Sequence, residues 1–313
     1  MTRSVKFLLG AARLGAVALA VATGLATPQA QADEATSDAP GDCCLLGTPN
    51  LDFSKSNATG NIGIADNGGF VGTAPGTVIG TVEFAAGNTG QFMPNGVTAT
   101  ATFGNANVQT ASNALSALSQ SLGTEPGMAL TIAGGGSVSA AGGILDGSGN
   151  EVFSATIGGS FVAGTTFTIS GTSSQSVVIN IPTTGGHAFD GRIVLTGGII
   201  SDNVLFNFDA GDYITGTLGD TLEISTGNST PTTGTYLDPN GPFHIYDTVL
   251  DGRIFGGGSQ FDSSIINSII VAPVSTIVAP VPEPSSLALL GAGLVAFGFI
   301  RRRYRPLPLP VGS

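Results

Sequence analysis

The chain contains no tryptophan, and it has only four tyrosines among its 313 residues. Clefts that cleave glycans usually stack sugar rings on aromatic side chains, so this composition disfavours a glycan-active enzyme. The Gly-x-Ser-x-Gly elbow, the His-Glu-x-x-His helix and the Gly-x-x-x-x-Gly-Lys phosphate loop are absent as well. We therefore expect no catalytic, cofactor-binding or metal-binding residue, and we expect His187 and His244 to be ordinary turn or strand residues. A hydrolase that uses two carboxylates is the alternative, because it needs only two acids at a suitable separation.

Basic residues are scarce outside the two ends of the chain. Three of the ten Lys and Arg residues lie before residue 14 and four lie after Ile300, which leaves Lys55, Arg192 and Arg253 in between. All twenty-one acidic residues fall within that middle section, so its net charge is near −18. Such a surface repels nucleic acid and acidic membranes. We expect the acidity to keep the protein soluble outside the cell, and binding of divalent ions or cationic polymers is the alternative.

One acidic segment superficially resembles a calcium-binding loop. It runs from Asp146 to Glu151, but Glu151 stands where such a loop needs glycine, and Ile157 stands where it needs a bidentate acid. We therefore predict a turn there.

The N-terminal end has the parts of a secretory signal peptide. Basic residues precede an apolar stretch from Leu14 to Ala26, and Ala30 and Ala32 give the small-x-small pattern that signal peptidase needs. We predict a signal peptide over residues 1–32, followed by a flexible segment over residues 33–50. An uncleaved N-terminal anchor is the alternative.

The C-terminal end combines a polar motif, a short apolar run and a basic cluster. Pro282, Glu283 and Pro284 lead into an apolar run that ends at Ile300. As a helix, the run from Leu287 to Ile300 would be roughly 21 Å long, which is short for a hydrocarbon core of about 30 Å. Four arginines follow, and they are expected to stay on the cytoplasmic side as a stop-transfer cluster; they are Arg301, Arg302, Arg303 and Arg305. We predict a transmembrane sorting helix with this cluster over residues 285–305, and a tail over residues 306–313.

This arrangement resembles the PEP-CTERM sorting signal of Gram-negative bacteria. The resemblance is confined to the C-terminal end, where the three parts occur in the expected order. It implies that an exosortase recognises Pro282, Glu283 and Pro284, cleaves nearby and passes the protein from the inner membrane to the cell surface or extracellular matrix. The tail after the arginines departs from the usual signal, which ends soon after its basic cluster. An ordinary C-terminal anchor beside a proline-rich stalk is the alternative.

The middle of the chain has an all-β composition. Glycine accounts for 48 residues, and short runs of Val, Ile and Phe are broken by Gly, Asn or Asp. Alternating apolar residues predict strands; the clearest runs are Val177, Ile179 and Ile181, then Val204, Phe206 and Phe208, and Val78, Val82 and Phe84 with Gly80 at the inward position. We expect one β-rich domain over residues 51–272, built as an irregular β-solenoid, with a β-sandwich as the alternative.

One segment has helical periodicity instead. Ala111, Leu115, Leu118 and Leu122 recur at helical spacing, and Gly123 follows as a stop signal. The polar face of this segment has no basic residue, which disfavours a lipid-binding role. We predict one amphipathic helix over residues 108–122, packed on the β domain.

The order of Gly-, Asn- and aliphatic-rich segments in this domain resembles the choice-of-anchor A domain of bacterial surface proteins. The predicted helix carries this resemblance together with the segments 61–64, 77–84, 203–208, 250–257 and 264–273. The pattern is also similar to the ice-binding-type solenoid, in which a helix lies beside an irregular β-helix. The resemblance implies a structural role at the surface or in the matrix, with no catalytic residues to carry over. A proline-rich spacer is expected over residues 273–284, between this domain and the sorting helix.

Thr98, Thr100 and Thr102 form a row with strand spacing, and a flat stack of several such rows would match an ice surface. Only one row is convincing, so an ice- or glycan-binding module is an alternative function.

Cys43 and Cys44 are adjacent and are the only cysteines. Outside the cytosol they tend to oxidise, but a vicinal pair closes a strained ring. We predict either a local disulfide or a link between two chains.

Together these features predict an exported, non-catalytic structural or adhesion protein at the surface or in the exopolysaccharide matrix of a Gram-negative bacterium. The expected partners are signal peptidase, an exosortase, the inner membrane transiently, and exopolysaccharide, with no nucleic acid and no cofactor. A secreted glycan-active enzyme on a β-solenoid is the alternative.

Overall fold

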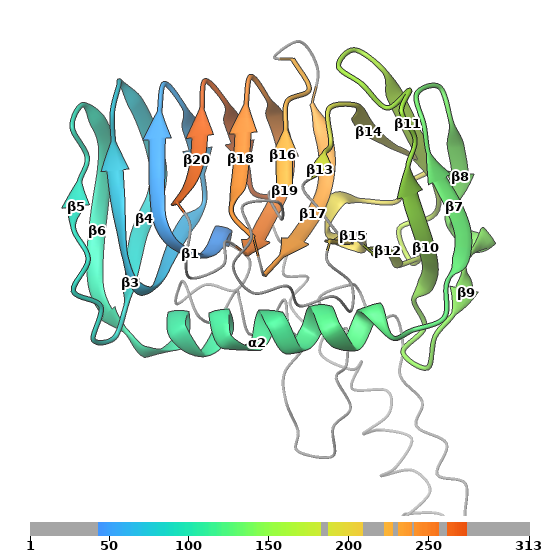
Figure 1. Cartoon of the computed structure of the whole chain (residues 1–313), viewed down its shortest axis with the longest axis horizontal. Helices are drawn as coiled ribbons and strands as arrows, with labels where there is room; N and C mark the ends of the chain where they lie inside the picture. Colours follow the sequence, from blue (N-terminus) through green and yellow to red (C-terminus); the bar gives the residue numbers. More distant parts are fainter. Residues whose placement is uncertain are drawn as a thin grey trace, which may run out of the picture. The chain divides into compact units, whose positions relative to one another are not determined.

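The described residues form a β-solenoid with one long helix beside it (Figure 1). The computed structural model describes residues 43–182, 187–208, 222–227, 231–239, 241–256 and 262–273. The helix is α2 (Ala106–Gly123), and two short 3₁₀ helices, η2 (Ala140–Gly142) and η3 (Ser201–Asn203), lie in connections. The solenoid predicted from the sequence is confirmed, and the β-sandwich alternative is wrong, because nearly all strand pairs are parallel.

Most strands are short, and a few longer ones continue around a corner of the coil. In chain order they are β1 (Cys43–Ser54), β2 (Asn57–Thr59), β3 (Asn61–Gly72), β4 (Gly76–Ala85), β5 (Phe92–Met93), β6 (Val97–Asn105), β7 (Met128–Ile132), β8 (Ser137–Ser139), β9 (Ile144–Leu145), β10 (Glu151–Ile157), β11 (Thr166–Ser170), β12 (Val177–Ile181), β13 (His187–Ala188), β14 (Arg192–Thr196), β15 (Val204–Phe208), β16 (Leu222–Ile224), β17 (Thr232–Asp238), β18 (Phe243–Tyr246), β19 (Val249–Gly256), β20 (Asp262–Ile266) and β21 (Ile269–Val271).

The parallel pairs make three ladders in the large sheet and a separate small sheet. The first, which we call the helix face, has the order β7-β10-β12-β15-β17-β19-β1-β3-β4-β6. The second, the β18 face, has the order β13-β16-β18-β20-β1-β3-β5. The third, the β2 face, has the order β17-β19-β21-β2-β4-β6, and a separate sheet β8-β11-β14 completes the set. Long strands such as β1 and β4 bend from one ladder into the next.

The coils do not follow one another along the stack in the order in which they occur in the chain. It starts in the middle with β1 and builds coils outward to β6 at one end. The helix α2 then runs along the stack, and β7 starts the coils at the other end (Figure 1). From there, successive coils lead back toward the middle of the stack. There β19 and β20 pair with β1, and β21 pairs with β2. We call this meeting of the last coils with the first one the junction.

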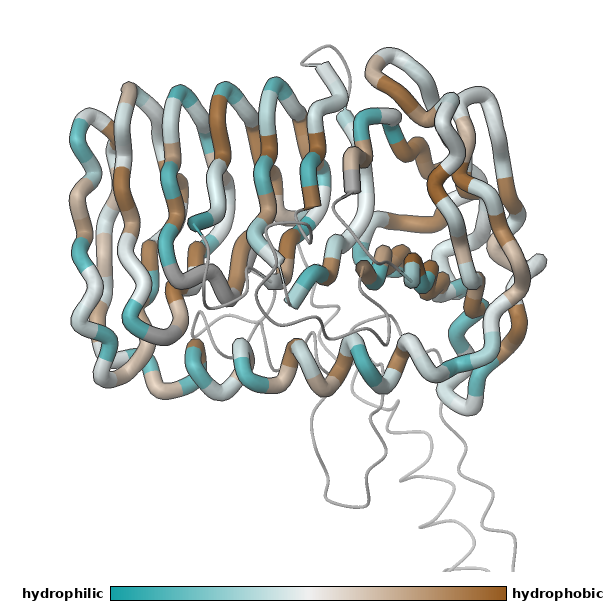
Figure 2. Tube along the Cα trace, viewed as in Figure 1, coloured by the Kyte–Doolittle hydropathy of each residue, from teal (hydrophilic) through white to brown (hydrophobic). Residues whose placement is uncertain are grey.

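Inward side chains of successive coils stack into one core, and apolar residues recur at matching places along the tube (Figure 2). Aromatic rings are prominent in this core. Phe70 lies between Phe53 and Phe92, with ring centroids 5.7 and 5.6 Å apart. Further along, Phe189 contacts Phe206 and Tyr236 at 5.4 and 5.7 Å. Such ring pairs add to the stabilisation that their burial provides.

Buried hydroxyl groups connect the coils at one corner. The backbone N–H of Thr226 donates to the Oγ1 of Thr248 at 3.1 Å, and the N–H of Thr248 donates to the Oγ of Ser268 at 3.2 Å. The N–H of Ser268 then donates to the Oγ of Ser56 at 3.0 Å. This series crosses the junction, because Ser56 belongs to the first coil and Ser268 to the last. Each hydroxyl satisfies an amide that the turn of the coil would otherwise leave without a partner.

The helix α2 packs on the helix face, close to the predicted bounds. All four residues of the predicted apolar stripe are buried, and they contact Leu46, Val178, Leu237 and Phe255 among the outward side chains of the strands. The helix begins over Glu83, whose carboxylate accepts hydrogen bonds from Asn61 at 3.1 Å and from the N-cap residue Asn105 at 2.7 Å. A negative charge near a helix N-terminus is favourable.

Two asparagines hold the other end of the helix. The Nδ2 of Asn207 donates to the backbone oxygen of Ser119 at 3.0 Å and to the Oδ1 of Asn180 at 2.9 Å. The Nδ2 of Asn180 donates to the backbone oxygen of Leu122 at 2.6 Å. The Oγ of Ser119 donates to the Oδ1 of Asn207 at 2.6 Å. We call Ser119, Asn180 and Asn207 the asparagine clamp, and all three are buried.

Two expectations from the sequence are wrong in detail. The domain begins at Cys43 rather than at residue 51, because Leu45 and Leu46 are fully buried and pair at the junction, so residues 43–50 are not a flexible segment. Gly80 does not face inward. It is exposed with a φ of +149°, at the corner where β4 leaves the β2 face, and a Cβ there would lie 2.5 Å from the backbone oxygen of Gly60.

We expect Asn207→Ala to lower the free energy of unfolding by about 2–3 kcal/mol, because it leaves polar groups of Ser119 and Asn180 buried without a partner. Chemical denaturation measures this loss. Asn113→Ala, on the exposed side of the same helix, is the control and should change stability by less than about 0.5 kcal/mol. Equal stability of the two variants would show that the clamp does not hold the helix.

Candidate functional site

Most sequence-predicted site residues lie outside the described part of the chain. This applies to the signal-peptidase site, to the motif of Pro282, Glu283 and Pro284, and to the arginine cluster. Their roles stay predictions. In the ranges that the structure describes, no helix is long and apolar enough to cross a membrane. The predicted sorting helix at residues 285–305 falls beyond those ranges.

Cys43 and Cys44 open β1, where the backbone of Cys43 pairs with Asn61 of β3. They therefore lie at the start of the folded domain and not in a flexible segment. A disulfide between them, or one to a second chain, stays a prediction.

The two histidines are strand residues, as predicted. His187 opens β13, and His244 lies in β18. The Nε2 of His244 lies 3.3 Å from the backbone oxygen of Asp262, and its ring contacts Tyr246 with centroids 5.9 Å apart. Among the described residues, no group of three or more His, Cys, Asp or Glu side chains is placed to hold a metal ion.

The predicted turn at Asp146 is confirmed. The carboxylate of Asp146 accepts hydrogen bonds from the backbone N–H groups of Ser148 and Asn150, each at 2.8 Å, and from the side chain of Asn150 at 2.8 Å. The acid therefore stabilises its own loop.

The β18 face is polar. One row across it contains Glu223, His244, Ser264 and Asp52, which follow each other in register on four neighbouring strands. Burial and the nearby Glu223 carboxylate raise the pKa of Asp190, which lies just after β13. This face therefore carries part of the acidity that the composition indicates.

The β2 face has a different chemistry. We call the outward side chains of β21, β2, β4 and β6 on this face the β2 patch; they are Ile269, Val271, Asn57, Thr59, Thr77, Ile79 and Thr98. None is charged, and the exposed fractions of Ile79, Ile269 and Val271 are 65%, 42% and 37%. Three exposed aliphatic side chains gathered on one face mark a candidate contact surface. The sequence did not reveal it, because residues 269–271 are a continuous apolar run whose faces cannot be told apart.

The predicted threonine row lies partly in this patch. Thr98 pairs with Thr77 on the β2 face, whereas Thr100 and Thr102 pair with Thr81 and Glu83 on the helix face. The register between β4 and β6 shifts between these two parts. The three threonines therefore do not form one flat row.

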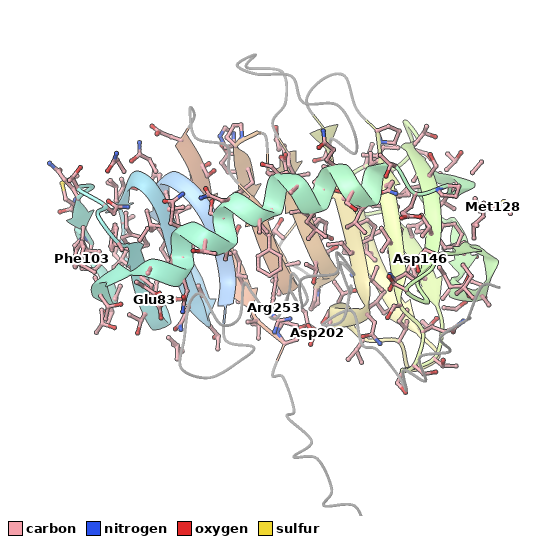
Figure 3. The ribbon with its side chains drawn as sticks, turned by 90° about the horizontal axis from the view of Figure 1, so that it is seen from below. Glu83, Phe103, Met128, Asp146, Asp202 and Arg253 are labelled. Carbon is pink, nitrogen blue, oxygen red and sulfur yellow. The ribbon has the colours of Figure 1, made fainter. Side chains whose placement is uncertain are left out.

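A buried ion pair lies where the described chain ends. Arg253 of β19 is fully buried and donates to the carboxylate of Asp202 in η3 (Figure 3). The same guanidinium donates to the backbone oxygen of Pro273 at 3.3 Å. Burial, and then the Asp202 charge, raise the pKa of Asp251. The folded chain therefore holds the Asp251 proton more tightly than the unfolded chain, and this group favours the folded state less as pH rises.

Two family models match the chain. Residues 280–303 match the model described as "PEP-CTERM protein-sorting motif". Residues 20–265, well over half of the chain, match the model described as "Putative Ice-binding-like adhesive domain". None of the curated proteins matches significantly.

Several solved structures are similar to the chain. One is an ice-binding protein from the Antarctic ascomycete Antarctomyces psychrotrophicus, with 14% identity, a TM-score of 0.46 and coverage of 75% of this chain and 96% of that one. Another, from an Antarctic bacterium of the Flavobacteriaceae, has 16% identity, a TM-score of 0.48 and coverage of 76% and 47%. A glycosylated ice-binding protein from an Arctic yeast has 12% identity, a TM-score of 0.45 and coverage of 78% and 94%.

We expect Arg253→Met to lower the free energy of unfolding by about 3 kcal/mol, because it leaves the Asp202 carboxylate without its partner. Adding Asp202→Asn should recover part of that loss, since it removes the unpaired charge. Lys55→Gln, at an exposed corner, is the matched control for loss of a positive charge. Thermal and urea denaturation of the wild type and the three variants measure these differences. Wild-type stability in Arg253→Met would contradict a stabilising role of the pair.

Proposed function

The chain belongs to the family of ice-binding-like adhesive domains, and we propose that it acts as a non-catalytic adhesion protein displayed on the cell surface. The observation that carries the proposal is that one chain combines this domain with a sorting motif. The motif implies export, processing by an exosortase and sorting to the cell surface. An adhesive domain needs such a position to meet a partner outside the cell.

The further steps of the route follow the order of the segments. In our proposal signal peptidase removes residues 1–32, and the apolar run in residues 285–305 holds the chain in the inner membrane of a Gram-negative cell until exosortase cleaves near Pro282, Glu283 and Pro284. The domain then reaches the surface or the exopolysaccharide matrix. Residues 273–284 act as a spacer, which supports access of the enzyme because prolines keep a chain extended.

Contacts at the end of β21 support the proposed start of the spacer. Pro273 follows β21, and its backbone oxygen accepts a hydrogen bond from the buried Arg253. β21 itself pairs on both sides, with β19 and β2. These contacts support a domain that extends to Pro273, where we propose that the spacer begins.

The β2 patch is the contact surface that we propose for adhesion. Its side chains are uncharged, and they repeat at the spacing of neighbouring parallel strands, about 4.8 Å. Desolvating Ile79, Ile269 and Val271 costs little compared with desolvating the acids of the β18 face. An uncharged surface such as a neutral polysaccharide is the kind of partner that fits.

We propose this adhesive use rather than direct ice binding. Ice binding would be favoured by several equal rows of threonine, whereas here Thr59 and Thr77 alternate with Ile79, Asn57 and residues of β21. The threonine row of β6 also divides between two faces.

Replacing Pro282, Glu283 and Pro284 together by alanine should prevent display of the protein. The variant should stay cell-associated with its C-terminal segment intact, because the exosortase no longer recognises it. Surface labelling of intact cells, together with mass spectrometry of the C-terminus, measures the effect, and we expect at least a tenfold loss of labelled protein.

Pro280→Ala is the control, since it removes a proline of the same stretch but leaves Pro282, Glu283 and Pro284 intact. It should be displayed like the wild type. Normal display and cleavage of the triple variant would refute sorting by this motif.

A further inference from the structure

The two end coils of the solenoid are almost free of charge. Between Glu83 and Asp146 the chain has a single charged residue, Glu125. This stretch contains β5 and β6 at one end of the stack, and β7, β8 and β9 at the other. All other described coils carry acids, so the charge that keeps copies of this protein apart is missing where the stack ends.

Both ends also present open strand edges. Within the described residues, β6 pairs only with β4, β7 pairs only with β10, and β8 pairs only with β11. Edge strands are usually protected by charged residues or prolines, because a free edge is a template for another strand. β6, β7 and β8 contain neither.

Core side chains are exposed at the same two ends. Phe103 of β6 stacks on Phe84 at 4.5 Å, yet 59% of it is exposed. Met128 of β7 pairs with the buried Phe153 and is 48% exposed. Figure 3 shows the two residues at opposite ends of the molecule. Each continues an inward row that stops for lack of a further coil.

The directions of the two edges match. β6 and β7 are the last and first strands of one parallel ladder, so they run the same way. A second copy shifted along the stack would present its β7 to β6 as one more parallel neighbour. The junction already shows such docking within the chain, since β1 pairs with β19 and β20 without a direct connection between them.

We propose that copies of this protein stack end to end, with β6 of one copy pairing in parallel with β7 of the next. Phe103 and Met128 then meet in the continued core. The contact is heterologous and does not close on itself, so it gives chains of copies rather than a defined dimer. This association goes beyond display at the surface and does not depend on the sorting motif.

Complementary blocked variants test the proposal. Phe103→Lys blocks the β6 end and Met128→Lys blocks the β7 end, because an inward charge on an edge strand prevents further pairing. The full-length chain is measured by sedimentation velocity in mild detergent. Micelles are in excess, so that the apolar C-terminal segments of two chains do not share a micelle and only the folded domains can join copies. The wild type should form a series of oligomers that lengthens with concentration. Each variant alone should stay monomeric, and an equal mixture of the two should form a 1:1 dimer, since each supplies the end that the other lacks.

Ile200→Lys is the matched control, because it adds the same charge at an exposed aliphatic residue between β14 and β15, inside the stack and outside the β2 patch, and it should assemble like the wild type. Circular dichroism checks that each variant is folded. If Phe103→Lys or Met128→Lys fails to fold, Thr102→Lys or Ala129→Lys takes its place, since a lysine at an exposed position of an edge strand also opposes pairing with another strand. A monomeric wild type at all concentrations, unchanged oligomers in the blocked variants, or no dimer in the mixture would overturn the proposal.

Discussion

The parallel pairing of β1 with both β3 and the last coils is the constraint on which the rest of the structure depends. A solenoid coil cannot bury its inward side chains alone and needs a neighbour on each side. Here the first coil receives one neighbour from the following residues and the other from the far end of the chain. The hydrogen bond from Ser268 to Ser56 joins residues 212 positions apart. Loop closure over such a distance is costly in entropy, so we expect the junction to form only when the coils on both sides are already present.

The helix follows from the same constraint. A chain that starts in the middle of the stack must cross to the other end after β6, and α2 makes that crossing on the helix face. Its apolar stripe covers Leu46, Leu237 and Phe255, which lie on strands of both halves of the stack. Glu83 and the asparagine clamp hold its two ends on opposite sides of the junction. The helix thus acts as a brace across the place where the coils are not connected in sequence.

Local features were predictable from the sequence, and long-range ones were not. The helix was found because Leu115, Leu118 and Leu122 repeat at a period that no strand has. The strand at Val177–Ile181 was predicted from the alternation of its apolar residues. All five of its residues are nevertheless buried, because one side of the strand faces the core and the other faces α2. Asn180, Asn207 and Arg253 carried no signal, because a polar residue in a strand normally faces solvent. The corner at Gly80 and the position of β1 depend on pairing between distant coils, which periodicity along one strand does not encode.

Hydrogen exchange of the native protein tests the central role of the junction most directly. If the junction holds the two halves together, the paired amides of β1, β19 and β20 exchange only through global unfolding, at the same free energy as those of β12 and β15 in the interior of the stack. The amides of the edge strand β6 should exchange at a lower free energy. Faster exchange in β1 and β19 than in β12, at conditions where the protein stays folded, would show that the junction opens by itself and would contradict this account.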